Sequence, residues 1–177
     1  MPRTRVVRTA AILAAVLLAI IGWYLGSPLF IRTSLNEPMP TLAIATARVT
    51  SGPTATPLAV ISADVLTSVL ARGELRAVDS LHHGSGAVML LRVGVRRFLR
   101  FEDVAISNAP DVHVYLSRET GGTWVEATSI YLGPLKATDG SFNYDIPVGA
   151  DLAPIRSVVV WCRAFSVLVT WADLGPA

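Results

Sequence analysis

An uncharged run near the N-terminus restricts this chain more than any other feature. No residue from Thr9 to Ile31 carries a charge, and Ala, Leu, Ile and Val dominate the run. Built as an α-helix with a rise of about 1.5 Å per residue, the run reaches roughly 35 Å, more than the bilayer's hydrocarbon thickness of about 30 Å. Trp23 and Tyr24 lie in its C-terminal half, where aromatic rings favour the membrane interface. Residues 9–31 are therefore predicted to form a transmembrane anchor, with the lipid bilayer as partner.

The flanking charges predict the orientation of this anchor. Arg3, Arg5 and Arg8 precede the apolar run and no acidic residue does, so residues 1–8 are expected to form a cytoplasmic tail. Everything after Arg32 then lies outside. The chain is predicted to be a single-pass protein of the plasma membrane with an extracytoplasmic C-terminal domain.

A cleaved signal peptide is the alternative for the same segment. We favour an uncleaved signal anchor, because the apolar region of a signal peptide usually has only about 7–15 residues. The stretch Gly22–Ile31 is also bulky, contains Pro28 and shows no clear A-x-A cleavage site. A lipid-anchored form is excluded, since no cysteine follows the run at a position where it would be acylated.

The charge balance argues against a nucleic-acid partner. The formal net charge is +2 at pH 7, but three of the arginines precede the apolar run and all 13 acidic residues follow it. The outer part of the chain is therefore nearly neutral, and no basic stripe remains to follow a phosphate backbone. Arginine strongly outnumbers lysine, a bias that indicates a GC-rich genome and, on composition alone, a bacterial source.

The segment after the anchor, residues 32–63, is poor in large apolar residues and rich in Pro, Thr and Ala. Because its prolines block regular structure, it is predicted to be a semi-extended stalk. After it, Ser62 or Asp64 is expected to cap a short helix that ends at Gly73. The apolar positions of this helix are Val65, Leu66, Val69 and Leu70.

Residues 64–177 are predicted to form one all-β domain. Short β-type runs alternate there with turns rich in Gly, Pro, Asn or Asp, which supply a positive φ or a fixed turn geometry. About eight strands at this spacing, without a long helical period, predict an antiparallel β-sandwich. The expected strands are Leu75–Leu81, Gly86–Val93, Arg97–Phe101, Val112–Leu116, Trp124–Tyr131, Phe142–Ile146, Val158–Ala164 and Ser166–Leu174. Trp161 is expected to anchor the core, since its strand is apolar on both faces.

Motifs of common catalytic sites are absent from the sequence. It contains no G-x-S-x-G, P-loop, H-E-x-x-H, G-x-G-x-x-G or C-x-x-C-H pattern. His82 and His83 lie close to Ser85, but neighbours in a strand point to opposite faces and do not pair as nucleophile and base. A blue-copper site lacks its usual spacing, because no His or Met follows Cys162. These patterns indicate no independent catalytic activity.

Two places remain as candidate functional sites. Cys162 is the only cysteine; a lone thiol in an outer domain is either a small core residue or a reactive group. Asp111, His113 and Tyr115 share one face of their strand, which puts a carboxylate, an imidazole and a phenol in one row. This row is either a polar ladder around a site or the solvent face of an edge strand.

Several blocks of the sequence resemble, in order, the DM-thirteen domain family. The block at 108–117 (NAPDVHVYLS) is similar to the family's GPDLHVYLS, and the block at 157–167 (SVVVWCRAFSV) is similar to SVxIWCxxFSVxF. The blocks at 131–136 and 143–147 together resemble LGxLKG…NYxVP, and those at 82–86 and 99–103 resemble the opening pattern. The agreement runs from Gly73 to Leu174. Ala109 and Ala137 stand where the family usually has Gly.

The resemblance implies a β-sandwich that takes part in electron transfer outside the cell membrane. The family's proposed redox centre corresponds to Cys162, as a bare thiol or as a ligand to a haem or metal, and a membrane redox protein is the implied partner. Asp111, His113, Tyr115 and Trp161 are then candidates for the surrounding site. Two functions stay open: an accessory redox domain, or a cell-surface binding or structural module in which Cys162 belongs only to the core.

Overall fold

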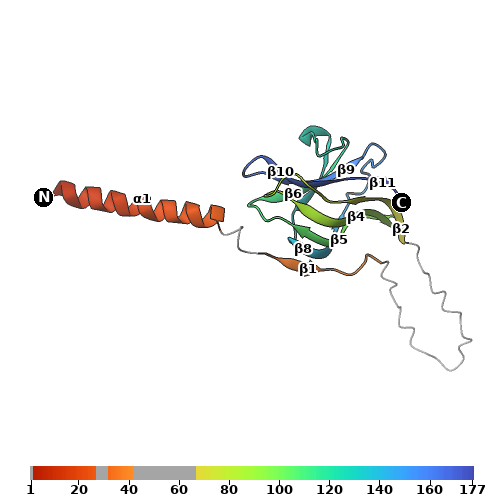
Figure 1. The fold of residues 1–177 in the computed structure, drawn as a ribbon, viewed down its shortest axis with the longest axis horizontal. Coiled ribbons are helices and arrows are strands. Elements are labelled where there is room, and N and C mark those ends of the chain that lie inside the picture. Colours follow the sequence, from red (N-terminus) through yellow and green to blue (C-terminus); the bar gives the residue numbers. More distant parts are fainter. Residues whose placement is uncertain (1, 27–31, 42–66) are drawn as a thin grey trace, which may run out of the picture.

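The computed structural model describes residues 2–26, 32–41 and 67–177 (Figure 1). Helix α1 (Pro2–Gly26) forms the N-terminal part. Its window Val7–Tyr24 has a mean hydropathy of 1.9, and none of the window is buried. By length and composition this helix is able to cross a membrane, a property that signal sequences share. The last residues of the predicted anchor, 27–31, lie outside the described part.

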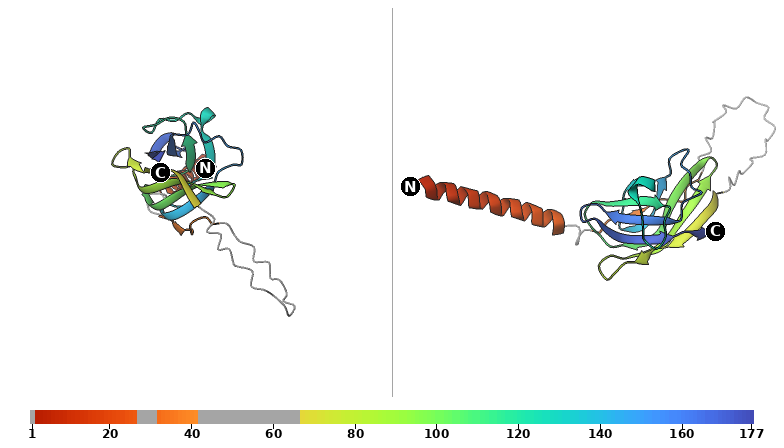
Figure 2. Two further views of the ribbon diagram at one scale, coloured as in Figure 1. Left: turned by 90° about the vertical axis from the view of Figure 1, so that its right-hand side faces the viewer. Right: turned by 90° about the horizontal axis from the view of Figure 1, so that it is seen from above.

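The rest of the described chain is mostly β and forms two sheets dominated by antiparallel pairs (Figures 1 and 2). The first sheet contains, in spatial order, β1 (Ser34–Asn36), β8 (Asp139–Asp145), β5 (Arg96–Ile106), β4 (Gly84–Val93), β2 (Thr67–Glu74) and β11 (Gly175–Pro176). The second contains β3 (Arg76–Ala77), β10 (Val167–Asp173), β9 (Ser157–Cys162), β6 (Val112–Ser117) and β7 (Ile130–Pro134). A short 3-10 helix, η2 (Glu126–Thr128), precedes β7.

One hydrophobic core takes side chains from both sheets. The first sheet contributes Phe101 and Phe142, whose rings stack with their centroids 5.1 Å apart. The second contributes Val114, Val158 and Val160, all fully buried. Because alternate residues of a strand point to opposite faces, the longer strands send alternate side chains into this core, and Leu91, Val93 and Phe98 form a second, smaller cluster. Each such burial contributes about 1.5–3 kcal/mol to the stability of the domain.

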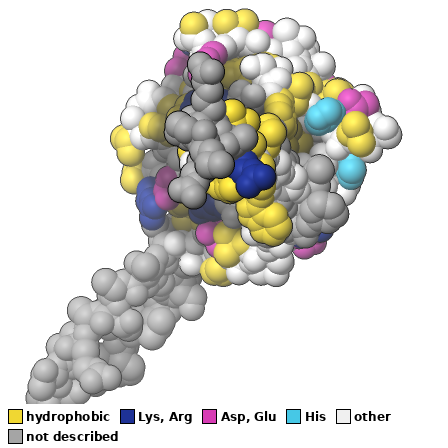
Figure 3. All heavy atoms as spheres, turned by 90° about the vertical axis from the view of Figure 1, so that its left-hand side faces the viewer, with side chains coloured by type: hydrophobic (Ala, Val, Ile, Leu, Met, Phe, Trp, Pro, Cys, Tyr) yellow, Lys and Arg dark blue, Asp and Glu magenta, His cyan; other side chains and the backbone are white. Residues whose placement is uncertain are grey.

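The outer surface of the domain carries charges of both signs. On the face drawn in Figure 3, the Lys and Arg side chains are scattered among Asp, Glu and hydrophobic side chains and do not gather in one large basic field. Several of these charges are paired: Arg96 lies 2.5 Å from Asp145, and His82 lies 2.9 Å from Asp79. Exposed pairs of this kind contribute little to stability, because water and salt screen them.

Six expected strands correspond to β4, β5, β6, β8, β9 and β10, and two expectations are wrong. The run Leu75–Leu81 forms only the two-residue β3. The chain then turns, because the carboxylate of Asp79 accepts hydrogen bonds from the backbone N–H groups of Leu81 and His82, each at 2.7 Å. The run Trp124–Tyr131 contains η2, and β7 starts only near its end.

The predicted short helix before Gly73 is also wrong. Its described part lies in β2, which pairs antiparallel with β4 and β11. Val69 and Leu70 fit the helical period, but β4 pairs with this segment on both sides of Leu70, at Val69 and Ala71, and tertiary pairing overrides a weak local preference. The proposed caps, Ser62 and Asp64, lie outside the described residues.

The predicted stalk, residues 32–63, needs a correction at its start. Residues 32–41 pack on the first sheet, where β1 pairs with β8 as the one parallel pair. Arg32 Nε donates to Asp139 Oδ2 at 2.9 Å, and this hydrogen bond holds the pKa of Asp139 below its usual value. Composition did not reveal this docking, because it depends on partners about a hundred positions away in the sequence. Residues 42–63 lie outside the described part.

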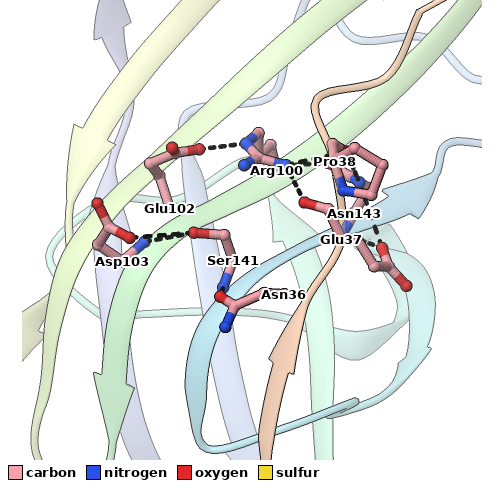
Figure 4. A network of polar contacts seen from close by, with 8 residues as sticks. All are labelled: Asn36, Glu37, Pro38, Arg100, Glu102, Asp103, Ser141 and Asn143. Atoms are coloured by element: carbon pink, nitrogen blue, oxygen red, sulfur yellow. Dashed lines mark hydrogen bonds and ion pairs between the residues drawn. The ribbon is translucent and has the colours of Figure 1, made fainter.

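A buried arginine fixes the docked segment to the sheet (Figure 4). Arg100, 5% exposed on β5, forms an ion pair with Glu102 and donates to Asn143 Oδ1 at 3.0 Å. It also donates to the backbone carbonyls of Glu37 and Pro38, at 3.2 and 3.3 Å. The Glu37 carboxylate in turn accepts from the backbone N–H of Asn143 at 2.7 Å. The guanidinium therefore joins three segments that are remote in the sequence.

We expect the substitution Arg100→Ala to destabilise the domain by about 3 kcal/mol, because it leaves a carboxylate and two carbonyls without their buried donor. Thermal and urea unfolding of the full chain in detergent, followed by tryptophan fluorescence, measures the change. Arg92→Ala is the matched control: Arg92 is exposed on the neighbouring strand, and its loss should change stability by at most about 0.5 kcal/mol. Equal stabilities of the two variants would contradict the role given to Arg100.

Candidate functional site

The register between β6 and β9 decides on which face each candidate side chain lies. Val112 pairs with Cys162, and His113 pairs with Trp161. Because side chains alternate along a strand, the first pair points into the core and the second points away from it. Cys162 and the row that contains His113 therefore lie on opposite faces of the same sheet.

Cys162 lies in the hydrophobic core. It is fully buried beside core residues of both sheets, and its Sγ donates a hydrogen bond to the carbonyl of Pro110 at 2.8 Å. The thiol is thus hydrogen-bonded to the backbone and enclosed by apolar side chains, so a metal or haem has no access to Sγ. In the described part of the chain no three His, Cys, Asp or Glu side chains lie together as metal ligands would. In this conformation Cys162 does not fit the role of a haem or metal ligand.

The outer face of the second sheet carries a hydrogen-bonded chain of three side chains. Asp111 Oδ1 lies 2.7 Å from His113 Nε2, and His113 Nδ1 lies 2.8 Å from the hydroxyl of Tyr131. A carboxylate only accepts hydrogen bonds, so Nε2 carries the imidazole proton. In the neutral ring Nδ1 is then the acceptor, and Tyr131 donates to it. The chain runs from a phenol through a base to the carboxylate that orients the base.

This arrangement differs from the predicted row in its phenol. Tyr115 does lie on the same face, but its hydroxyl accepts a hydrogen bond from Arg163 Nε at 2.8 Å. Burial raises the pKa of Tyr115, and the hydrogen bond from Arg163 opposes this shift. Tyr115 therefore stays a neutral phenol without a base beside it, whereas Tyr131 has one.

A β-bulge brings Tyr131 to the outer face. Val114 pairs with Gly133, but the next residue of β6, Tyr115, pairs with Tyr131, so Leu132 is the extra residue of β7. In a regular ladder Tyr131 would pair with Leu116 and would point into the core. The φ of +130° at Gly133 is a conformation that glycine adopts without a steric penalty. Bulges commonly redirect a side chain in this way.

Four aromatic rings cover this face of the sheet. The ring centroids of Tyr131 and Tyr115 are 5.2 Å apart, those of Tyr115 and Trp124 4.4 Å, and those of Trp124 and Trp161 5.1 Å. Trp161 is thus only partly buried and belongs to this outer group, which we call the aromatic cluster. The expectation that it anchors the core is wrong, because alternation gives the core side of β9 to its neighbours Val160 and Cys162.

Arg163 completes the site from the turn that follows β9. Its guanidinium carbon lies 4.7 Å from the ring centroid of Tyr131 and 5.6 Å from that of Tyr115, and Glu126 is 3.7 Å away as a counter-charge. The backbone N–H of Arg163 donates to the carbonyl of Asp111 at 3.0 Å, which ties this turn to the start of β6. The cation–π contacts fix the tyrosine rings from above.

Reasoning from the sequence found Asp111, His113, Tyr115 and Trp161 but missed Tyr131, Trp124 and Arg163. Tyr131 was included in a predicted strand as an ordinary residue, and only a bulge brings it to His113. Trp124 lies in the loop before η2, and Arg163 lies in a turn, so neither follows a strand period. The only available signal was that Tyr131 and Arg163 fall inside the two blocks that resemble the DM-thirteen family.

The geometry defines a class before any comparison: a two-sheet β domain with a buried thiol and an outward Tyr–His–Asp chain. The family model described as Electron transfer DM13 matches residues 77–174, which is more than half of the chain. The protein therefore belongs to this family, whose description indicates a redox-related role. Comparison with curated proteins and with solved structures gave no match.

The burial of Cys162 predicts slow reaction of its thiol in the folded protein. A maleimide at neutral pH should modify the native chain at least about 100-fold more slowly than the chain in denaturant, because reaction requires opening of the core. The modified fraction is followed by mass spectrometry; Cys162 is the only cysteine, so each label reports on this site. Labelling of the native protein at the denatured rate would show that the thiol is accessible.

Proposed function

We propose that this protein is an extracytoplasmic accessory of an electron-transfer system, held to the plasma membrane by residues 9–31. The family match over residues 77–174 is the observation that carries the redox part of the proposal. The same proposal includes the antiparallel β-sandwich fold that the family resemblance implies. The large hydrophobic core to which both sheets contribute supports this fold.

Three features support the membrane part of the proposal. Helix α1 is long and apolar enough to span a bilayer. The arginines that precede it favour a cytoplasmic N-terminus. Helix α1 ends at Gly26, and Arg32, six positions later, is already hydrogen-bonded to Asp139 of the β domain. Because each residue extends a chain by at most about 3.6 Å, this connection spans no more than roughly 22 Å, so the anchor keeps the domain close to the membrane.

A topology experiment tests this part. Alkaline phosphatase fused after Ala177 should be active in a bacterial host, because the enzyme folds only outside the cytoplasm, and a cytoplasmic reporter at the same position should be inactive. Replacing Arg3, Arg5 and Arg8 with Glu should lower the phosphatase signal, since these charges set the orientation. An active cytoplasmic reporter on the unmodified chain would overturn the topology.

The redox group itself has two candidate locations, the Cys162 thiol and the outer face of the second sheet. For Cys162 to cycle, or to bind a haem or metal, the segment around Pro110 has to move away from Sγ. The alternative function, a cell-surface binding or structural module with Cys162 as a core residue, is favoured by one observation: the thiol is fully buried in this conformation. A membrane redox protein is the expected partner only if the protein is an electron-transfer accessory.

The two functions predict different chemistry at Cys162. Cells that produce the full chain are acid-quenched under oxidising and reducing conditions, and thiols are then labelled in denaturant. Redox cycling predicts a mixed disulfide or an oxidised thiol that is reversible and absent in Cys162→Ser. A core role predicts a fully reduced thiol under both conditions, with Cys162→Ser folding less stably because a polar group enters the core. The second result would remove Cys162 from the electron-transfer proposal and leave the outer face.

A further inference from the structure

We propose that Tyr131 is a redox-active tyrosine, oxidised by one electron while its phenolic proton passes to His113. This inference rests on the proposed electron-transfer function and assigns that function a group on the outer face. It is carried by the geometry of the chain Tyr131–His113–Asp111, with hydrogen bonds of 2.8 and 2.7 Å. The Tyr131 side chain also reaches the surface, where it is 43% exposed.

The step balances within the site and one partner. An outer-sphere one-electron oxidant, such as an oxidised metalloprotein, takes one electron from the Tyr131 ring. The phenolic O–H bond breaks at the same time, and the proton moves to His113 Nδ1. The products are a neutral tyrosyl radical, an imidazolium paired with the Asp111 carboxylate, and the reduced oxidant. A one-electron donor reverses the step, and the proton returns along the same hydrogen bond.

Arg163 makes the proton transfer necessary. Its guanidinium lies over the Tyr131 ring, a contact that stabilises the electron-rich neutral ring. Loss of an electron without the proton would leave a ring cation beside this fixed positive charge. Loss of both leaves a neutral ring, and the new positive charge forms on His113, where the 45% exposed carboxylate of Asp111 stabilises it.

The other tyrosines of the outer domain lack this arrangement. Tyr115 is 1% exposed, and its hydroxyl is bound by Arg163, which has no capacity to accept a proton. Tyr144 donates to the carbonyl of Pro134 at 2.9 Å, and a backbone carbonyl does not serve as a base at neutral pH. Tyr131 is thus the one phenol of these three that combines surface access with a base. The other rings of the aromatic cluster, which contact Tyr131 through Tyr115, are able to share the oxidising equivalent before it settles on Tyr131.

Photo-oxidation of the purified full chain in detergent tests the proposal. Laser flashes on ruthenium tris-bipyridine with an electron acceptor generate a one-electron oxidant, and transient absorbance and EPR identify the radical. The wild-type chain should form a tyrosyl radical. Tyr131→Phe should abolish it and leave oxidation on tryptophan, whereas the matched control Tyr144→Phe should leave the yield unchanged. A tyrosyl signal that survives in Tyr131→Phe would overturn the assignment.

The rate of radical formation tests the two positioning residues. Replacing the base in His113→Gln should slow the reaction by about 100-fold, the lower end of what a positioned base contributes. It should also abolish the solvent deuterium isotope effect that proton transfer gives the wild type. Asp111→Asn should slow the reaction less; it suits the fold because Asp111 has φ 57°, which Asn tolerates well. Rates equal to wild type in both variants, with native circular dichroism, would refute the proposal.

These experiments are independent of those on the proposed function. If the Tyr131 radical forms but the domain proves cytoplasmic, the redox tyrosine stands and the proposed topology is contradicted. If the radical forms and Cys162 also cycles, the protein has two redox groups. If the topology is confirmed and no Tyr131 radical forms, only the redox role of Tyr131 is refuted.

Discussion

Strands β6 and β9 lie side by side within the five-stranded sheet, with Val112 opposite Cys162 and His113 opposite Trp161. This pairing sorts the chemically active side chains of the domain into two environments. On one face the thiol joins an apolar core. On the other face the imidazole meets a phenol and a carboxylate. A slip of one residue would exchange the two faces, so the register that builds the core also builds the site.

The site also needs departures from regular structure. The bulge in β7 turns Tyr131 outward, and the turn after β9 places Arg163 above its ring. The turn just before β6 carries Asp111 at a positive φ, a conformation that Asp adopts more readily than most residues. Regular strands therefore supply the rigid frame, and three local irregularities supply the contacts.

Sequence reasoning recovered those parts of the molecule that follow a local period. Alternation placed Asp111, His113 and Tyr115 on one face, and six of the expected strands are present. What it missed depends on contacts between distant positions: the parallel pairing of β1, the bulge at Leu132 and the burial of Arg100. Trp161 shows the same limit, because a strand that is apolar on both faces does not reveal which face meets the core.

The docked segment relates the site to the proposed membrane anchor. Arg32 forms an ion pair with Asp139, and the next residue, Thr33, lines the same surface pocket as Asp111 and Pro134. The carboxylate end of the Tyr–His–Asp chain therefore lies at the end of the domain where the chain arrives from the proposed anchor. Because the connection from Gly26 to Arg32 spans no more than roughly 22 Å, this end of the domain stays near the helix terminus. Under the proposed function, a redox partner anchored in the same membrane would approach the domain at this end, and anchoring both proteins in one bilayer would raise their effective concentration without any new contact.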